Sequence, residues 1–291
     1  MKLLLLDHLA LFHRARAALV RTGREYSTSD GRPTTGVFAY INTVLAIIKS
    51  QDPTHVIVCF DAGGNSRKKE SDTYKANRTG MSDSFYKESQ VVLEEALYAM
   101  GIEAVGLRGF EADDLLYTYS HTARFGTQRF DEIVIATVDQ DLLQCVNETT
   151  KVLLFNSAKK QVLMGVEETI AKWGCEPADI RFIKAISGDS SDNIAGVKGV
   201  GPKTALKIME EAEWNFHEAL KHPKLKDHAD LLMANLDLVN LRLVVGELGP
   251  ITWKDYELGK GMRSDLTALF ESYEMSSLIK RQTNIMKTLK M

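Results

Sequence analysis

Leu3-Leu4-Leu5-Leu6-Asp7 begins the chain with four consecutive leucines followed by a carboxylate. Two later stretches have the same form: apolar residues 56–60 lead into Asp61, and residues 133–136 lead toward Asp139. Near-continuous apolar runs of this length are typical of strands that are buried on both faces, as in a parallel sheet. The sequence therefore predicts an α/β fold with a mainly parallel central sheet.

Acidic side chains gather at the ends of these three runs and at two further places, residues 111–114 and 188–192. Side chains just past the carboxyl ends of parallel strands meet in one crevice. Like charges there repel one another, and divalent cations relieve the repulsion. Oxygen-only ligands favour Mg²⁺ or Mn²⁺ over zinc. The predicted metal ligands are Asp7, Asp61, Glu111, Asp113, Asp114, Asp139, Asp141, Asp189 and Asp192.

Helix capping is the ordinary alternative for single members of this set. Asp often follows a strand as the N-cap of the next helix, which accounts for Asp7 or Asp61 taken alone. The helix macrodipole favours one acid at a helix start, but it does not require the three in residues 111–114. Capping therefore explains individual residues better than it explains the whole set.

Helical spacing predicts which acids in residues 111–114 and 188–192 lie on the same side of a helix. Glu111 and Asp114 share a face at helical pitch, whereas Asp113 points elsewhere. Asp189 and Asp192 also share a face if their segment is helical. A metal site beside an anionic substrate indicates phosphoryl chemistry, in which paired ions activate the attacking water and stabilise the leaving oxygen.

A phosphatase of the haloacid-dehalogenase type also begins with a strand and an Asp. That class needs a second Asp two residues later, where this chain has Leu9. The sequence therefore disfavours this interpretation.

Bulk composition is that of an ordinary globular protein, with 291 residues, 44% hydrophobic and 26% charged content, and a net charge of −3. Cys59, Cys145 and Cys175 are odd in number and form no CxxC pair, which argues against a disulfide framework or a zinc site. No apolar stretch reaches the roughly 20 residues of a membrane helix. We expect a cytoplasmic protein with no membrane partner, acting as a monomer.

Two segments carry clustered basic residues. Within residues 62–84, Arg67, Lys75 and Arg78 lie around Tyr74. Basic side chains pair with phosphates, and an aromatic ring can stack on an unpaired base for roughly 1–3 kcal/mol. A solvated loop is the alternative for this segment.

The second segment is a glycine-rich turn, Gly196-Val-Lys198-Gly199-Val-Gly201-Pro-Lys203-Thr204-Ala205, which precedes a predicted helix. A glycine hairpin between two helices presents backbone N–H groups and a helix N-terminus to phosphates. A tight interhelical turn without a ligand is the alternative. No buried strand leads into this turn, so a dinucleotide-binding fingerprint is disfavoured.

Taken together, the motifs resemble those of the 5′-nuclease (flap endonuclease) family, including the 5′-nuclease domain of bacterial DNA polymerase I and stand-alone bacterial and phage relatives. The resemblance runs from Leu3 to about Leu278 and keeps the family's order. The matching segments are Leu3–Asp7 with Arg14-Ala15, Phe60–Ala62, Tyr74–Arg78, Gly109–Asp114, Thr137–Asp141, Gly188–Asn193 and Gly196–Ala205.

The resemblance implies a PIN-like nuclease core at residues 1–170, with a helical arch at about 62–95. It implies a helix-hairpin-helix DNA-binding region with C-terminal helices at residues 171–291. The implied activity is Mg²⁺-dependent cleavage of DNA phosphodiesters at junctions of single and double strands, on branched or flapped DNA with a 5′ single-stranded end. Mn²⁺ is expected to substitute for Mg²⁺, and K⁺ is expected to bind the hairpin carbonyls.

The resemblance also assigns roles to single residues. Asp7, Asp61, Glu111 and Asp113 would serve the first metal ion, and Asp139, Asp141, Asp189 and Asp192 the second, with Asp114 near both. Lys75 and Arg78 would contact the scissile phosphate as catalytic groups, and Tyr74 would stack on the terminal base. The residues expected to face DNA are Arg14, Arg67, Tyr74, Lys198, Gly199, Gly201, Lys203 and Thr204.

The chain departs from the family pattern at His8, where Gly is usual, and at Val138 and Gln140 around Asp139. None of these changes removes a carboxylate. Two alternatives stay open: a PIN-type ribonuclease acting on single-stranded RNA, and a non-catalytic DNA-binding module that uses the hairpin alone.

Overall fold

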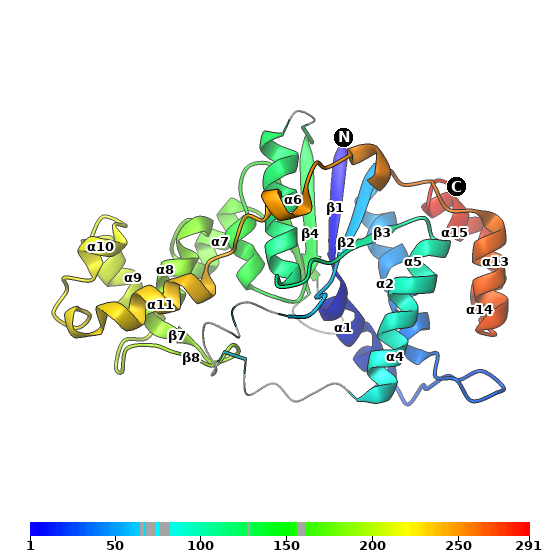
Figure 1. Ribbon diagram of the computed structural model, residues 1–291, viewed down its shortest axis with the longest axis horizontal. Helices are drawn as coiled ribbons and strands as arrows, with labels where there is room; N and C mark the ends of the chain where they lie inside the picture. Colours follow the sequence, from blue (N-terminus) through cyan, green and yellow to red (C-terminus); the bar gives the residue numbers. More distant parts are fainter. Residues whose placement is uncertain (65–66, 68–73, 76–81, 127–128, 156–160) are drawn as a thin grey trace.

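A six-stranded sheet forms the centre of this computed structural model, which describes residues 1–64, 67, 74–75, 82–126, 129–155 and 161–291. The strand order is β3-β2-β1-β4-β5-β6 (Figure 1). The first five of these strands are parallel to their neighbours, and β6 pairs antiparallel with β5. The strands are β1 Lys2–Asp7, β2 His55–Cys59, β3 Glu103–Val105, β4 Glu132–Thr137, β5 Thr150–Phe155 and β6 Gln161–Met164. The predicted α/β fold with a mainly parallel sheet is confirmed.

β1 lies in the middle of the sheet because its four leucines are fully buried on both faces. Leu6 pairs in register with Val58 of β2 and Ala136 of β4. The three strands therefore end at the same edge, which brings the carboxylates that follow them close together.

Helices cover both faces of the sheet. Leu4 and Leu6 face a cluster with α1, α2 and the C-terminal helices, whereas Leu3 and Leu5 face a cluster with α6 and α8. Figure 1 shows α13–α15 beyond α2 and α5 on one side, and α8–α11 extending on the other. The helices near the sheet are α1 His8–Val20, α2 Thr35–Gln51, α4 Asp83–Val91, α5 Leu97–Ala99, α6 Ala112–Phe125 and α7 Val166–Trp173.

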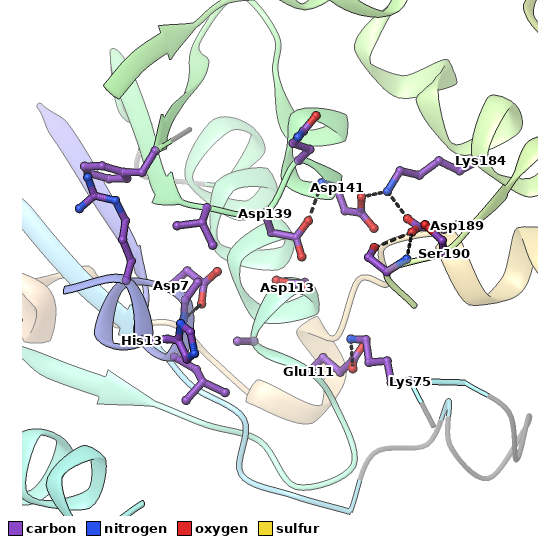
Figure 2. Close-up of a pocket in the computed structure, with 18 of the residues that line it drawn as sticks. Asp7, His13, Lys75, Glu111, Asp113, Asp139, Asp141, Lys184, Asp189 and Ser190 are labelled. Atoms are coloured by element: carbon purple, nitrogen blue, oxygen red, sulfur yellow. Dashed lines mark hydrogen bonds and ion pairs between the residues drawn. The ribbon is translucent and has the colours of Figure 1, made fainter. Parts of the chain in front are cut away.

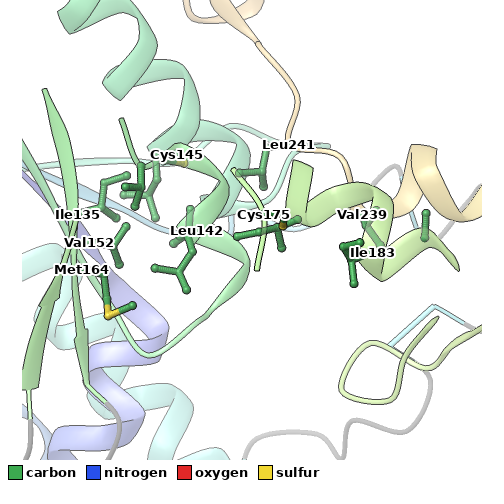
Figure 3. Packing of buried hydrophobic residues seen from close by; sticks show 14 of the residues in the cluster. Ile135, Leu142, Cys145, Val152, Met164, Cys175, Ile183, Val239 and Leu241 are labelled. Carbon is green, nitrogen blue, oxygen red and sulfur yellow. The ribbon is translucent and has the colours of Figure 1, made fainter. Parts of the chain in front are cut away.

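The second half of the chain is mostly helical and shares the core of the sheet. Sheet residues Ile135 and Val152 are in one buried cluster with Leu142, Ile183 and Val239 (Figure 3). The later elements are α8 Ile180–Ser187, β7 Gly188–Asp189, β8 Ile194–Ala195, α9 Pro202–Glu211, α10 Phe216–Ala219, α11 Ala229–Val239, α12 Val245–Leu248, α13 Arg263–Ser272, α14 Ser276–Ile279 and α15 Gln282–Thr288. Short 3₁₀ turns lie at Asp141–Cys145, Pro177–Asp179, Lys226–His228 and Trp253–Tyr256.

The pair β7–β8 corrects one sequence-based expectation. Residues 188–195 form a short antiparallel ribbon with a turn, so Asp189 and Asp192 are not on one helical face. The amide of Asn235 on α11 donates to the carbonyls of Ala185 and Ala195. This bridge ties the ribbon to α8 and fixes the position of Asp189.

Three other features of the fold do not follow from the apolar runs of the sequence. Residues 161–164 of β6 are only partly buried and lack a long apolar run. The helix through α4 and α5 is continuous and contains a π-helical turn at Val92–Ala96. The chain end forms three short helices, α13, α14 and α15.

The division at residue 170 stays a prediction, as does the arch at about 62–95. Part of the expected arch, including Arg78, lies outside the described residues. Within the described ranges, no helix is both long and apolar enough to cross a lipid bilayer.

Candidate active site

A groove of about 1060 Å³ lies at the carboxyl edge of the sheet, between α1, the start of α6 and the end of α8. Figure 2 shows Asp7, Asp113 and Asp139 directed toward a common space, with Asp141 and Asp189 beside it. Seven predicted ligands line the groove: Asp7, Asp61, Glu111, Asp113, Asp139, Asp141 and Asp189. Carboxylates from distant parts of the chain are thus brought together.

Asp7 both caps a helix and faces the groove. One carboxylate oxygen accepts a hydrogen bond from the Ala10 backbone N–H at 3.3 Å, which makes Asp7 the N-cap of α1. The other accepts from the Thr137 hydroxyl at 2.6 Å. Burial, together with the charges of Asp139 and Asp61, raises the pKa of Asp7 to about 7 despite these hydrogen bonds. Asp7 therefore does cap α1, as the capping alternative predicts, and it also belongs to the acidic cluster of the groove.

Asp113 has no capping role, and burial raises its pKa well above the ordinary value. The negative charges of Asp139 and Asp7 raise it further. Asp139 is held in place by its own backbone N–H, which donates to Thr137 Oγ1 at 2.9 Å, and by the Asp141 N–H, which donates to its carboxylate at 2.8 Å. Asp7, Asp113 and Asp139 thus repel one another, as an acidic cluster without a cation is expected to do.

Glu111 and Asp114 lie on one side of α6, as helical spacing predicts, and both bind Arg67. The Arg67 guanidinium contacts Glu111 at 2.6 Å and Asp114 at 2.7 and 3.0 Å. Arg67 is only 2% exposed and Asp114 only 1%. The resemblance implies a DNA-facing Arg67, whereas here the side chain is turned inward because two buried carboxylates attract it. Asp114 lies behind the groove rather than in its lining.

Tyr74 and Lys75 dock against Glu111 and Asp192. The Tyr74 hydroxyl contacts Glu111 at 3.0 Å and Asp192 at 3.2 Å, and Lys75 Nζ forms an ion pair with Glu111. Lys75 Nζ lies 3.8 Å from Asp192, and the Lys75 backbone N–H donates to the Asp192 carbonyl. Tyr74 is 3% exposed, so in this arrangement its ring is not presented for stacking. Lys75 lines the groove, but Asp192 and Tyr74 do not.

Lys184, which the sequence analysis did not single out, bridges Asp141 and Asp189. Its Nζ lies 2.6 Å from Asp189 Oδ2 and also forms an ion pair with Asp141. Burial opposes ionisation of Asp189, but the Lys184 and Ser191 hydrogen bonds outweigh it and lower its pKa to about 2. Thr137 is a second residue that sequence reasoning missed. Thr137 could have been identified from the sequence because its hydroxyl stands at the last position of β4, two residues before Asp139.

The donor set fits a divalent cation. The groove offers carboxylate oxygens, and burial, together with the charges of neighbouring acids, raises the pKa values of Asp7 and Asp113. Among the residues that the structure describes, no three acidic, His or Cys side chains already surround one point in ligating geometry. Lys75 and Lys184 hold part of the set in ion pairs instead.

The glycine-rich turn lies on the surface between β8 and α9. Lys198, Gly199, Gly201 and Lys203 are exposed, and Thr204 is half-buried. Val197 and Val200 are buried and anchor the turn, and Gly199 has a φ of +82° that favours glycine. The exposed N-terminus of α9 is therefore available to an anion.

Arg14 lines the same groove. Its guanidinium lies over the ring of Phe155, 4.4 Å from the centroid. Burial, and then the charge of Arg21, lower the pKa of Arg14. The groove thus carries the basic side chains of Arg14 and Arg21 as well as its acids.

A family model described as 5′-3′ exonuclease, N-terminal resolvase-like domain, matches residues 2–174. A Bacillus subtilis protein named 5′-3′ exonuclease is 34% identical over 215 residues, which are 73% of this chain and 71% of that protein. DNA polymerase I of Caldicellulosiruptor bescii is 35% identical over 215 residues, which are 72% of this chain. The chain spans about a quarter of that polymerase, 24% of its length.

A solved structure of bacteriophage T5 flap endonuclease superposes with a TM-score of 0.67 over 100% of both chains. It is 18% identical in sequence, so it supports the fold alone. That structure is described as a pseudo-enzyme-product complex with DNA and metal ions.

Proposed function

This chain belongs to the 5′-3′ exonuclease family of 5′ nucleases, and from that premise we propose that it is a structure-specific DNA nuclease dependent on Mg²⁺. Its proposed substrates are branched or flapped DNA with a 5′ single-stranded end, hydrolysed at the junction with the duplex as in replication or repair. The observation that carries the proposal is the meeting of Asp7, Asp113 and Asp139 in one groove. We further propose that the chain acts as a monomer.

Asp7, Asp113 and Asp139 would hold one divalent ion, with Asp61 and Glu111 nearby. The resemblance assigns Asp139 to the second ion; we place it with the first because its charge acts on both Asp7 and Asp113. Asp141 and Asp189 would hold a second ion. Asp192, which pairs with Lys75, and Asp114, which is bound by Arg67, lie outside the groove lining. When bound, such ions stabilise charge on the attacking and leaving oxygens of a phosphodiester. Hydrogen bonds from the protein orient this site: the Thr137 hydroxyl donates to Asp7, and the backbone N–H groups of Asp141 and Ala112 donate to the carboxylates of Asp139 and Asp61.

Lys75 is the proposed catalytic cation from the described residues. Its Nζ stands at the groove in a buried pair with Glu111, where a positive charge can stabilise negative charge that develops on a phosphate. Arg78 is proposed for the same role on family grounds, and Tyr74 for stacking on the terminal base. Arg67 would hold Glu111 and Asp114 unless DNA draws it outward.

The exposed glycine-rich turn is proposed to grip the duplex as part of a helix-hairpin-helix unit in residues 171–291, with K⁺ on its carbonyls. Backbone N–H groups of Gly199 and Gly201, with Lys198, Lys203 and Thr204, would contact phosphates without reading base sequence. Arg14 would contact DNA from the wall of the groove.

Lys203→Ala is expected to weaken duplex binding and to flatten the slope of log K against log salt by about one unit, because one phosphate contact is lost. Fluorescence anisotropy at several salt concentrations measures this slope. Lys254→Ala removes an exposed lysine from a 3₁₀ turn beside β2 and is expected to leave the slope unchanged. An unchanged slope in Lys203→Ala would place that lysine off the DNA.

Mg²⁺ is expected to stabilise the protein more at about pH 8 than at about pH 5.5. Because the folded pKa of Asp7 is raised from 3.8 to about 7, the ion-free protein loses stability from this group as pH rises between these two values, and the loss is complete above about 7. A bound cation favours the ionised carboxylate and offsets the loss. Scanning calorimetry with EDTA or Mg²⁺ at both pH values measures the effect. In Asp7→Asn, the stabilisation by Mg²⁺ should differ less between the two pH values than it does in the wild type. Equal stabilisation of the wild type by Mg²⁺ at both pH values would contradict the assignment of Asp7 as a ligand.

Cleavage of a 5′-flap DNA substrate, with and without Mg²⁺, tests the proposed function. We expect release of the flap with Mg²⁺ and none in EDTA. Cleavage of single-stranded RNA of equal sequence in preference to the flap would support the ribonuclease alternative instead. DNA binding with no cleavage, whether Mg²⁺ is present or absent, would support the non-catalytic DNA-binding module instead.

A further inference from the structure

Lys184 links three separate elements at the groove. It stands in the last turn of α8 and is 9% exposed. It contacts Asp189 on β7 and Asp141 on the 3₁₀ turn after β4, and all three residues line the groove. Figure 2 shows its ammonium group between the two carboxylates. Lys184 Nζ forms an ion pair with Asp141 Oδ1.

The negative charges in the two halves of the acidic groove are therefore compensated to different extents. In one half, Asp7 and Asp113 face other carboxylates. In the other half, one lysine stands between two carboxylates and reduces their combined charge from two negative units to one. A cation-sized site is thus already filled by a positive group of the protein itself.

We propose that Lys184 is a built-in counter-ion that occupies the second divalent-metal position between Asp141 and Asp189 and must be displaced before that ion binds. The inference rests on the proposed function, because it concerns the regulation of the same groove. It predicts that the half with Asp7, Asp113 and Asp139 takes an ion first. The second ion binds weakly because only the fraction of molecules with a displaced lysine can accept it.

Displacement also supplies a positive group to the substrate. The lysine side chain is flexible and carries three donors on a compact charge. Once released from Asp141 and Asp189, Nζ remains at the groove wall, within reach of an anionic ligand there. A phosphate and the second ion would therefore favour each other's binding, since each compensates for the loss of the lysine pair.

Titration of the ion-free protein with Mn²⁺, followed by the electron paramagnetic resonance signal of the free ion, tests the inference. Three variants are compared with the wild type. Lys184→Met keeps the length of the side chain without its charge, and Lys184→Arg keeps the charge. Lys221→Met removes a surface lysine that pairs with Glu218 and serves as the charge-matched control. Melting temperatures are measured in EDTA and in saturating Mn²⁺.

We expect the weaker Mn²⁺ site to tighten by roughly ten- to a hundredfold in Lys184→Met, because a competing charge within a few ångströms is removed. Lys184→Arg and Lys221→Met should retain the weak site. In EDTA, Lys184→Met should melt at a lower temperature than the wild type, because two carboxylates lose their counter-ion. In saturating Mn²⁺, Lys184→Met and the wild type should melt at the same temperature.

A lysine with only a structural role would lower the melting temperature equally in EDTA and in Mn²⁺ and leave Mn²⁺ affinity unchanged. That result, with normal Mn²⁺ binding by the wild type, would overturn the counter-ion inference alone. Absence of Mn²⁺ binding by the wild type and all variants would overturn the proposed function and this inference together.

Discussion

Asp139→Asn is expected to abolish phosphodiester cleavage while leaving DNA binding in place. Asp139 faces Asp7 and Asp113, and Asn removes one negative charge where the first cation is proposed to bind. The substitution keeps an oxygen that can accept the hydrogen bond from the Asp141 N–H, so local geometry should survive. We expect the cleavage rate to fall by about a thousandfold or more, as when metal-dependent charge stabilisation is lost.

Single-turnover cleavage of a 5′-flap substrate and anisotropy of the same DNA measure the two effects separately. Asp255→Asn is the matched control, because it removes a carboxylate whose side chain is 66% exposed and outside the groove. Cleavage by Asp139→Asn within tenfold of the wild type would remove this residue from the metal site. Loss of DNA binding together with cleavage would indicate a structural defect instead.

Lys75→Ala is expected to lower kcat by about two to three orders of magnitude with little change in KM. A positive group aimed at developing negative charge contributes about 3–4 kcal/mol in the transition state. Lys75 Nζ is positioned for this role at the groove, where Glu111 and Asp192 hold it. Steady-state kinetics on flap DNA at saturating Mg²⁺ gives kcat and KM separately.

Lys75→Arg retains the charge and should recover part of the activity, although guanidinium geometry differs from that of an ammonium. The positive φ of Lys75, 53°, is the same for both variants, so backbone strain does not distinguish them. A change confined to KM would assign Lys75 to substrate binding rather than catalysis. Equal loss in Lys75→Arg and Lys75→Ala would show that the charge is not the decisive property.

The strands were predictable because burial on both faces leaves a strong pattern. β1 and β4 contain the apolar runs at residues 3–6 and 133–136, and their register explains why Asp7 and Asp139 meet. β6 was missed because an edge strand needs little apolar content. The ribbon at 188–195 was missed because its position depends on Asn235, which is distant in sequence.

The identity of the acids was predictable, but their partners were not. Helical spacing correctly separates Asp113 from Glu111 and Asp114. Nothing in the sequence indicates that Arg67 fills the space beside Glu111 and Asp114. The bridge by Lys184 is equally hidden, because Asp141 is 43 residues away and only tertiary packing of α8 brings the two together. Charge pairing across elements is a property of the folded chain.

Anomalous diffraction from crystals of the protein soaked in Mn²⁺ shows whether the acids of the groove share an ion. We predict a peak about 2 Å from carboxylate oxygens of Asp7, Asp113 and Asp139, close to the Mg²⁺–oxygen distance. The same residues would then be joined by one cation although they come from β1, α6 and the segment after β4. A well-ordered groove with no anomalous peak, or peaks only at surface carboxylates elsewhere, would contradict the proposed metal centre.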